Sequence, residues 1–323
     1  MQNALFEDAR YKSGISFIDY LQRKIDFYHE VGKASAASKL AVTLKVFCNF
    51  LSKNNFIAPN KSFCFEDLTD HLLILFEREL QSRYLSPNTT SFYMRILRSH
   101  YYQGVEDGLF FSITDPFRRV FTGVCKTKKR AISKNEFSQL IQAELPKKLQ
   151  FAKDLFLFSF YTRGMSLIDI AQLKRENIFK DEIRYCRRKT GQLIKINIEP
   201  CIREIIDKYS NMSGSNLIFP IMEKNGQRLQ YNTSLKNINN NLLKISKLLN
   251  FNCRLTTYVA RHTWASVAKW GGIPTSVISE CMGHTSERTT QIYLSTIEQE
   301  SIDDANRLVI HSLNKNLKCS ITN

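Results

Sequence analysis

The spacing of apolar residues along the chain changes at Asp115-Pro116, and this change limits the possible folds more than any other sequence feature. Before the break, apolar residues recur at the spacing of helices that bury one face. We predict four helices there, over 13–29, over 35–53, over 66–82 and from Ser86-Pro87 to about Gly108. In the fourth, Ser86 is the cap residue and Pro87 takes the first helical position. Residues 1–116 therefore predict an all-helical domain.

After the break, helical patterns surround a single hairpin pattern. Ser133 and Glu136 have the spacing of a capping box that opens a helix, and two strand-like segments flank Thr190-Gly191. Further helices are predicted over 148–162, 164–174, 200–210, 234–249, 257–270, 274–282 and 298–313. Residues 131–323 thus predict a mixed α/β domain, and the whole chain predicts a mostly α-helical fold with a small β-sheet.

Positive charge is concentrated after the break. The net formal charge is +16; residues 1–120 hold 15 basic and 13 acidic residues, and residues 121–323 hold 31 and 17. A lopsided basic surplus favours a nucleic-acid partner over a merely soluble basic protein. We expect the segment 117–130, which contains no acid, to link the domains in a position suited to phosphate contact. Its six basic residues are Arg118, Arg119, Lys126, Lys128, Lys129 and Arg130.

Composition also narrows the class of protein. The eight cysteines form no C-x-x-C pair and no zinc-like spacing with histidine, so we expect reduced thiols and no metal site. The first residues, MQNALFEDAR, include acids and lack the apolar stretch of a signal peptide. No apolar run approaches the roughly 18 residues that a membrane span needs. A cytoplasmic protein without membrane contact is expected.

Four short segments of the second half carry residues suited to chemistry on DNA. They are YTRGMSLIDIAQL at 161–173, RRKTG at 187–191, YVARHTWA at 258–265 and MGHTSERTTQIY at 282–293. Their order, spacing and surroundings resemble the tyrosine recombinase, or phage integrase, family, and the last two segments are the most specific. The resemblance covers most of the chain. It implies a helical SAM-like core-binding domain over 1–116, a basic linker over 117–130 and a catalytic domain over 131–323.

The resemblance implies site-specific cleavage and rejoining of DNA through a 3′-phosphotyrosine. Tyr293, nine residues after His284, matches the family's nucleophile. Arg261 matches the family's second arginine, which would hold the phosphate with a bidentate fork, and His284 matches a phosphate-binding histidine. Lys189, beside the predicted hairpin turn, is the candidate general acid. Neither a metal nor another cofactor is required, because the protein–DNA bond stores the energy of the broken one.

Each of these residues also has a structural interpretation. Tyr293 could pack in a helix, Arg261 could lie on a helix surface, and His284 could be a core histidine. Lys189 could be an ordinary hairpin lysine. The combination in one family-like order favours the catalytic interpretation.

One departure from the family pattern lies just before Arg261. A histidine usually stands three residues before this arginine, and here the position holds Tyr258. A tyrosine hydroxyl can still donate a hydrogen bond to a phosphate. His262 is a poor substitute, because adjacent residues on a helix point about 100° apart.

A second departure concerns the family's first arginine, whose position holds Ser166. Two arginines could supply the missing charge. Arg187 lies two residues before Lys189, on the same side of a strand, and Arg163 lies one helical turn before Ser166. We rank Arg187 slightly ahead. Asp169, three residues after Ser166, is expected to orient neighbouring basic groups.

The resemblance also implies a DNA partner and an oligomeric assembly, and it leaves several functions open. It implies double-stranded DNA with inverted-repeat core sites and a homotetramer on that DNA, in which 298–313 docks on a neighbouring protomer or packs in cis. Integration, excision and inversion all fit. A non-catalytic DNA-binding protein on the same scaffold is one alternative, suggested by Ser166. A relaxing topoisomerase is another, although it would not need specific half-sites.

Overall fold

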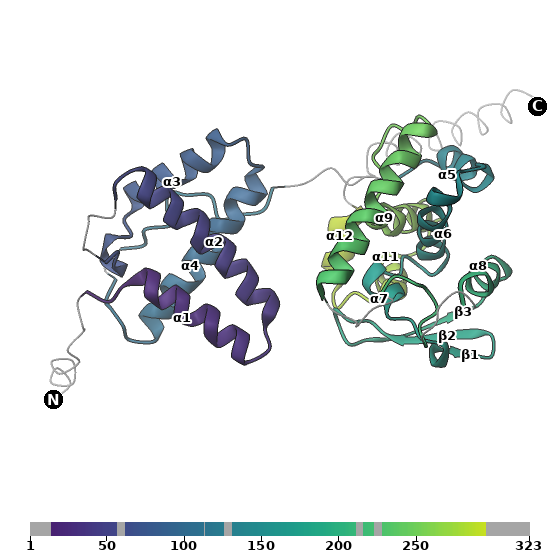
Figure 1. The fold of residues 1–323 in the computed structure, drawn as a ribbon, viewed down its shortest axis with the longest axis horizontal. Helices are drawn as coiled ribbons and strands as arrows, with labels where there is room; N and C mark the ends of the chain where they lie inside the picture. The colour runs from purple at the N-terminus through teal and green to yellow at the C-terminus, as the bar shows by residue number, and fades with distance from the viewer. Residues whose placement is uncertain are drawn as a thin grey trace, which may run out of the picture. The chain divides into compact units, whose positions relative to one another are not determined.

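The computed structural model describes residues 14–56, 62–112, 114–125, 131–210, 216–222 and 228–294. The chain divides into two compact units between Thr127 and Lys128, and both are drawn in Figure 1. The predicted tail helix over 298–313 and the last residues of the basic segment, 126–130, lie outside the described residues.

The regular structure of the first unit is helical. Its α-helices are α1 (Phe17–Glu30), α2 (Ala34–Lys53), α3 (Asp70–Ser82) and α4 (Pro87–Glu106). The predicted cap of α4 is confirmed, because the Ser86 hydroxyl accepts a hydrogen bond from the Thr89 amide at 3.2 Å. The predicted start of the third helix at 66 is wrong. A 3₁₀ turn at Phe65–Asp67 comes first, and Thr69 then caps α3 by accepting from the Leu72 amide at 3.3 Å.

Residues 117–125, the first part of the segment expected to link the domains, pack on the first unit. Phe117 and Val120 are buried in its core. The Asn88 side chain donates to the carbonyl of Cys125 at 2.9 Å and accepts from its amide at 2.7 Å. The Ser91 hydroxyl donates to the Gly123 carbonyl at 2.5 Å. These bonds hold the segment against α4.

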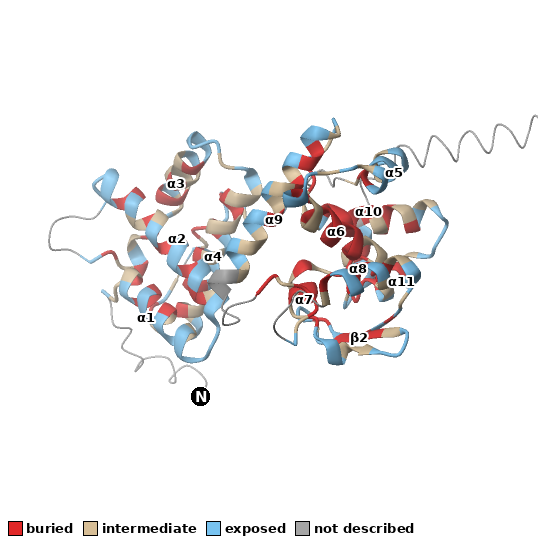
Figure 2. Ribbon diagram, turned by 45° about the vertical axis from the view of Figure 1, so that its right-hand side comes forward, coloured by how far each residue is buried: buried red, intermediate tan, exposed pale blue. Residues whose placement is uncertain are grey.

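The second unit is built around one buried helix. Its helices are α5 (Lys134–Gln142), α6 (Lys147–Tyr161), α7 (Leu167–Ala171), α8 (Pro200–Ser210), α9 (Arg228–Leu248), α10 (Thr257–Trp270), α11 (Thr275–Cys281) and α12 (Glu287–Leu294). α6 is buried along most of its length (Figure 2) and packs against α8, α9 and α10. The capping box at the start of α5 is confirmed, since Glu136 accepts from the Ser133 amide at 2.8 Å. α6 therefore organises the core of this unit.

A small antiparallel sheet borders this core. Its strands β1 (Ile178–Phe179), β2 (Glu182–Cys186) and β3 (Leu193–Asn197) lie in that order. The predicted hairpin pairs Cys186 with Leu193, and Gly191 takes a positive φ of 71° in its turn. β1 is an addition to the two predicted strands. The prediction of a mostly α-helical fold with a small β-sheet is confirmed.

No helix was predicted over 287–294, where the structure has α12. A signal was present, because Ser286 followed by Glu287 is typical of a helix start. Leu294 at the end of α12 joins a small apolar cluster with residues of α10, of α11 and of the α11 C-cap: Ala265, Ala268, Ile278 and Met282. This cluster fixes the end of α12 to α10. None of the helices in the described ranges has both the length and the apolar character to span a membrane.

Candidate active site

Arg261 lies in the second turn of α10 and is almost completely buried, with 4% of its surface exposed. Its guanidinium donates from Nη1 to the Gly164 carbonyl at 2.5 Å and from Nη2 to the Met282 carbonyl at 2.5 Å. Nη2 also approaches His284 Nε2 at 3.0 Å. The remaining buried donor, Nε, has no hydrogen-bond partner among the described residues. Buried donors without a partner are uncommon in native proteins, so this one calls for an explanation.

Two glycines allow the backbone to come this close to arginine side chains. At Gly164, with φ of +75°, a Cβ would lie 2.8 Å from Arg261 Cγ and 3.1 Å from Arg261 Cα. At Gly283, with φ of +62°, a Cβ would lie 3.0 Å from Arg187 Cδ. Any larger residue would clash or strain the backbone at either position. Both glycines therefore shape the site.

Arg187 is the second buried cation of the site, with 7% of its surface exposed. It directly follows β2 and continues the burial alternation of Ile183 and Tyr185. Its Nη1 donates to the Gly283 carbonyl, which also accepts from the Thr190 hydroxyl at 3.3 Å. Arg187 and Arg261 thus hold neighbouring carbonyls of one short segment, Met282-Gly283.

Neither guanidinium forms an ion pair with a carboxylate in the described part of the chain. The carboxylate of Asp169 is buried, but it accepts from the Ser166 hydroxyl at 2.6 Å and from the Arg188 amide at 3.0 Å. Burial and, to a smaller extent, the charge of Arg187 lower the pKa of Arg261 to about 10. Arg261 is still protonated at neutral pH. Two buried positive charges without a paired acid are costly, and an anion would relieve that cost.

His284 stands beside these cations. Its Nδ1 lies 2.8 Å from the hydroxyl of Thr290, a fully buried residue of α12. Burial lowers the pKa of His284 to about 3, and the positive charges of Arg261, Arg187 and Lys189 act in the same direction. The imidazole is therefore neutral at neutral pH.

Lys189 lies in the turn between β2 and β3 and is exposed. The prediction that it points to the same side as Arg187 assumed that the strand continues through both residues. Strand alternation holds only along the ladder, and β2 ends at Cys186, so residues 188–190 follow the turn instead. Asp169 fixes this turn through the Arg188 amide, and the lysine side chain extends from it. The charge of Lys189 still acts on His284.

Arg163 does not lie on a helix, so the helical argument that placed it one turn before Ser166 is wrong. It follows α6 in the connection to α7 and takes a positive φ of 58°. This left-handed conformation reverses the chain so that Gly164 can meet Arg261. The charge of Arg163 reaches the buried Tyr185, although its influence there is smaller than that of Arg261 or Arg187.

Tyr258 lies at the start of α10 and is 52% exposed. Partial burial raises the pKa of its hydroxyl, and the charges of Arg261 and Arg187 oppose this rise. Its ring meets that of the buried His262 edge to face, with centroids 4.7 Å apart. Tyr258 thus borders the arginine pair, and His262 packs behind it.

Tyr293 belongs to the last turn of α12, directly before the buried Leu294. Its side chain lies outside what the structure describes. The same helix carries Thr290, whose bond to His284 links α12 to the arginines. Thr290 was not among the predicted site residues, and neither Gly164 nor Gly283 had a predicted role. Their one sequence signal was their position inside the four motifs.

Known proteins share the sequence family and the fold of this chain. Residues 130–300 match the model of the phage integrase family, and residues 16–114 match that of the phage integrase SAM-like domain. A curated protein named tyrosine recombinase, from Pseudothermotoga lettingae, is 22% identical over 179 residues. That match spans 53% of this chain and 60% of the relative's length.

Solved structures share the fold at low sequence identity. A lambda integrase dimer bound to a COC' core site matches with a TM-score of 0.66 at 14% identity, covering 88% of this chain and 79% of that one. XerH site-specific recombinase, bound to a palindromic difH substrate in a post-cleavage complex, matches with a TM-score of 0.65 at 14% identity, covering 84% and 78%. A lambda integrase tetramer bound to a Holliday junction matches with a TM-score of 0.64 at 14% identity, covering 88% and 78%.

These matches confirm the predicted fold, a SAM-like domain followed by an integrase catalytic domain. The family model alone spans more than half of the 323 residues. The chain therefore belongs to the phage integrase, or tyrosine recombinase, family.

Proposed function

We propose that this chain is a site-specific DNA recombinase that cleaves and rejoins DNA through a 3′-phosphotyrosine at Tyr293. One observation carries the proposal. Arg261 and Arg187 are buried side by side on the Met282-Gly283 carbonyls without a carboxylate partner among the described residues, and Arg261 Nε has no bond there. A phosphate would supply both the missing charge and the missing acceptor.

The geometry favours Arg187 as the cation that replaces the arginine absent at Ser166. Ser166 already donates its hydroxyl to Asp169, and a neutral side chain cannot offset developing charge. Arg187 is buried beside Arg261, whose pKa it lowers. Arg163 would act mainly through the turn that presents Gly164 to Arg261, and Tyr258 would border the phosphate from the start of α10.

The reaction is a transesterification in which atoms balance. The Tyr293 hydroxyl attacks the phosphorus and releases its proton to solvent, the bond to the 5′-oxygen breaks, and that oxygen takes up a proton. Arg261, Arg187 and His284 would surround the non-bridging oxygens as their charge rises. Lys189, exposed on the hairpin turn, is placed to deliver the proton to the leaving oxygen. Rejoining reverses these steps with a 5′-hydroxyl of the partner strand.

We assign DNA binding to residues 1–116, the link to 117–130 and catalysis to 131–323. Substrates are DNA sites with inverted repeats, which a homotetramer would bring together for integration, excision or inversion. The similarity to a lambda integrase tetramer bound to a Holliday junction and to XerH bound to a palindromic substrate supports this assembly. The +14 charge of residues 121–323 supports a polyanionic partner.

A nicked suicide substrate tests the proposal. The nick releases a short strand after cleavage, so the covalent adduct accumulates and is visible on a denaturing gel. Wild-type protein is expected to form the adduct. Tyr293→Phe is expected to form none while binding the same DNA with unchanged affinity, because it loses only a hydroxyl.

The same assay separates the alternatives. DNA binding by the wild type without an adduct would identify a non-catalytic DNA-binding protein. Adduct formation and plasmid relaxation without a requirement for inverted repeats would identify a topoisomerase. An adduct formed by Tyr293→Phe would refute Tyr293 as the nucleophile.

A further inference from the structure

Ser166 stands at the N-cap of α7 but does not cap that helix. An N-cap serine usually accepts a hydrogen bond from a backbone amide of the first turn, as Ser133 does at the start of α5. The side chain of Ser166 accepts no such bond. Its hydroxyl instead donates to Asp169 Oδ2 at 2.6 Å. The hydroxyl therefore serves the carboxylate and not the backbone of its own helix.

The buried carboxylate of Asp169 joins two segments of the chain. Oδ2 accepts from Ser166, and Oδ1 accepts from the Arg188 amide at 3.0 Å. No cation is paired with this carboxylate within the described ranges. One bond to each oxygen fixes the rotation of the carboxylate about its Cβ–Cγ bond. Without the serine hydroxyl, Oδ2 would lose its donor, and turning the carboxylate toward another donor would relieve that cost.

The Arg188 amide belongs to the turn that carries Lys189. On one side of the lysine, Arg188 is held by Asp169. On the other side, the Thr190 hydroxyl donates to the Gly283 carbonyl at 3.3 Å. Among the described residues, these two bonds tie the turn to segments outside the hairpin. Lys189 thus extends from between two anchored residues, and one of the two anchors depends on Asp169.

We propose that Ser166 is a positioning residue that, through Asp169, holds the turn presenting Lys189 to the leaving 5′-oxygen. The proposal rests on the proposed function for the role of Lys189, while the link from Ser166 to the turn is a property of the free protein. The serine stands where the family has an arginine. In this chain the position serves the general acid, and Arg187 supplies the charge to the phosphate.

The chain offers matched variants for a test. Ser166→Ala removes the hydroxyl, and Ser166→Thr keeps it. Ser133→Ala is the control, because it removes a serine from the N-cap of α5, where the hydroxyl does cap the helix. Melting temperatures verify that all three variants fold. Ser133→Ala then shows what a weakened helix start in the same unit does to exchange and cleavage.

The first measurement is hydrogen exchange of the Arg188 amide in DNA-free protein, followed by NMR. In the wild type, the bond to the buried carboxylate protects this amide. Ser166→Ala should exchange it about tenfold faster or more, since a hydrogen bond to a charged group is weakened. Ser166→Thr and Ser133→Ala should exchange it at the wild-type rate. Unchanged exchange in Ser166→Ala would overturn the proposed link.

The second measurement is single-turnover cleavage at saturating DNA of two nicked substrates. One has the natural leaving 5′-oxygen, and the other has sulfur in its place. A thiolate leaves without a proton, so the sulfur substrate does not need the general acid. Ser166→Ala should cleave the oxygen substrate more slowly by on the order of 10²-fold, the cost of a misplaced reacting group. It should cleave the sulfur substrate as fast as wild type.

The controls and the contrary outcomes are distinct. Ser166→Thr and Ser133→Ala should stay within a few-fold of wild type on both substrates. An equal loss by Ser166→Ala on both substrates, or no loss on either, would refute action through Lys189. The same loss in Ser133→Ala would assign the effect to stability and also refute it. Absence of an adduct from the wild type would refute the proposed function, and the exchange of the Arg188 amide would still decide whether Ser166 holds the turn.

Discussion

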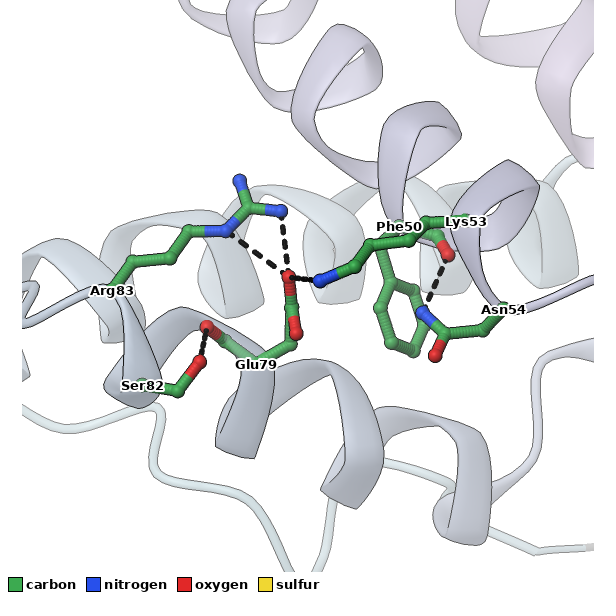
Figure 3. Close-up of polar contacts among 6 residues, drawn as sticks. All are labelled: Phe50, Lys53, Asn54, Glu79, Ser82 and Arg83. Atoms are coloured by element: carbon green, nitrogen blue, oxygen red, sulfur yellow. Dashed lines mark hydrogen bonds and ion pairs between the residues drawn. The ribbon is translucent and has the colours of Figure 1, made fainter.

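Two groups of positive charges, one in each unit, lie in opposite surroundings. In the first unit, cations lie at the surface beside acids. Figure 3 shows Glu79 of α3 between Lys53 of α2 at 3.1 Å and Arg83 at 2.9 Å. In the second unit, Arg187 and Arg261 are buried and bind backbone carbonyls, with no carboxylate paired to either in the part of the chain that the structure describes.

This difference separates charges that serve the fold from charges kept for a ligand. Exposed ion pairs cost little and stabilise little, typically below about 1 kcal/mol each. Buried cations cost far more unless they are neutralised. The cations of the Glu79 cluster already have an opposite charge beside them. The arginine pair gains one only when an anion binds. Four changes, ordered from the largest expected effect, test or sharpen this distinction.

Lys189→Ala should have the largest effect on cleavage. A positioned general acid contributes about 10²–10⁴-fold, so single-turnover cleavage should slow by that amount while DNA binding persists. A substrate whose leaving 5′-oxygen is replaced by sulfur needs no proton, and it should restore the rate of the variant. A defect that persists with the sulfur substrate would assign Lys189 to DNA contact instead.

Arg187→Ala should lower the cleavage rate by about 10²–10³-fold, the loss typical of one preorganised donor. DNA affinity should change little, because many other contacts hold the duplex. Arg163→Ala, at the left-handed turn before α7, is the matched comparison and should lose less. Normal cleavage by Arg187→Ala beside a crippled Arg163→Ala would reverse the assignment.

Acidification should destabilise the second unit through His284. Its pKa in the folded protein, about 3, lies below the ordinary value near 6.5, so the unfolded chain binds the proton first. The free energy of unfolding should therefore fall as pH drops below about 6.5, by up to a few kcal/mol. Denaturant titrations from pH 7 to pH 4 should show a shallower fall for His284→Gln.

A histidine of the first unit provides the control for that slope. His29 is exposed at the end of α1, so His29→Gln is the control for replacing a histidine away from the arginine pair. Burial also lowers the pKa of His100, so part of the slope should persist in His284→Gln. Identical slopes for wild type and His284→Gln would contradict the neutral, buried state of His284.

Arg83→Ala should have the smallest effect. It removes one of two cations from Glu79 at the surface, so unfolding should become easier by less than about 1 kcal/mol. Cleavage at saturating DNA should match that of wild type. Thermal melts at low and high salt provide the measurement. A loss of several kcal/mol would contradict the claim that this surface ion pair stabilises the fold only slightly.

The sequence predicted those features that depend on local chemistry. Ser86 and Ser133 marked helix starts because cap residues act within three positions. The hairpin at Thr190-Gly191 followed from alternation and a turn signal. The membership in the integrase family followed from motif order. The cap and turn signals are each contained in a few consecutive residues, as is each separate motif of the family.

Features that depend on tertiary contact were not predictable in this way. Lys189 lies beyond the end of the strand ladder, where alternation does not apply. The positive φ of Arg163 has no marker in its own residue type, since left-handed backbone favours glycine. The bond between His284 and Thr290 joins a loop to a helix that was not predicted. The carbonyl partners of both arginines also come from distant segments.

The most direct test of the central claim is a crystal structure with vanadate and a nicked core-site DNA. Vanadate bound between a tyrosine and a 5′-hydroxyl mimics the five-coordinate phosphorus of strand cleavage. The predicted result has Tyr293 Oη at one apex, with Arg261 Nε and an Arg187 nitrogen about 2.7–2.9 Å from the equatorial oxygens. Arg187 remaining only on the Gly283 carbonyl, or another side chain at the apex, would contradict the claim that this buried pair receives the scissile phosphate.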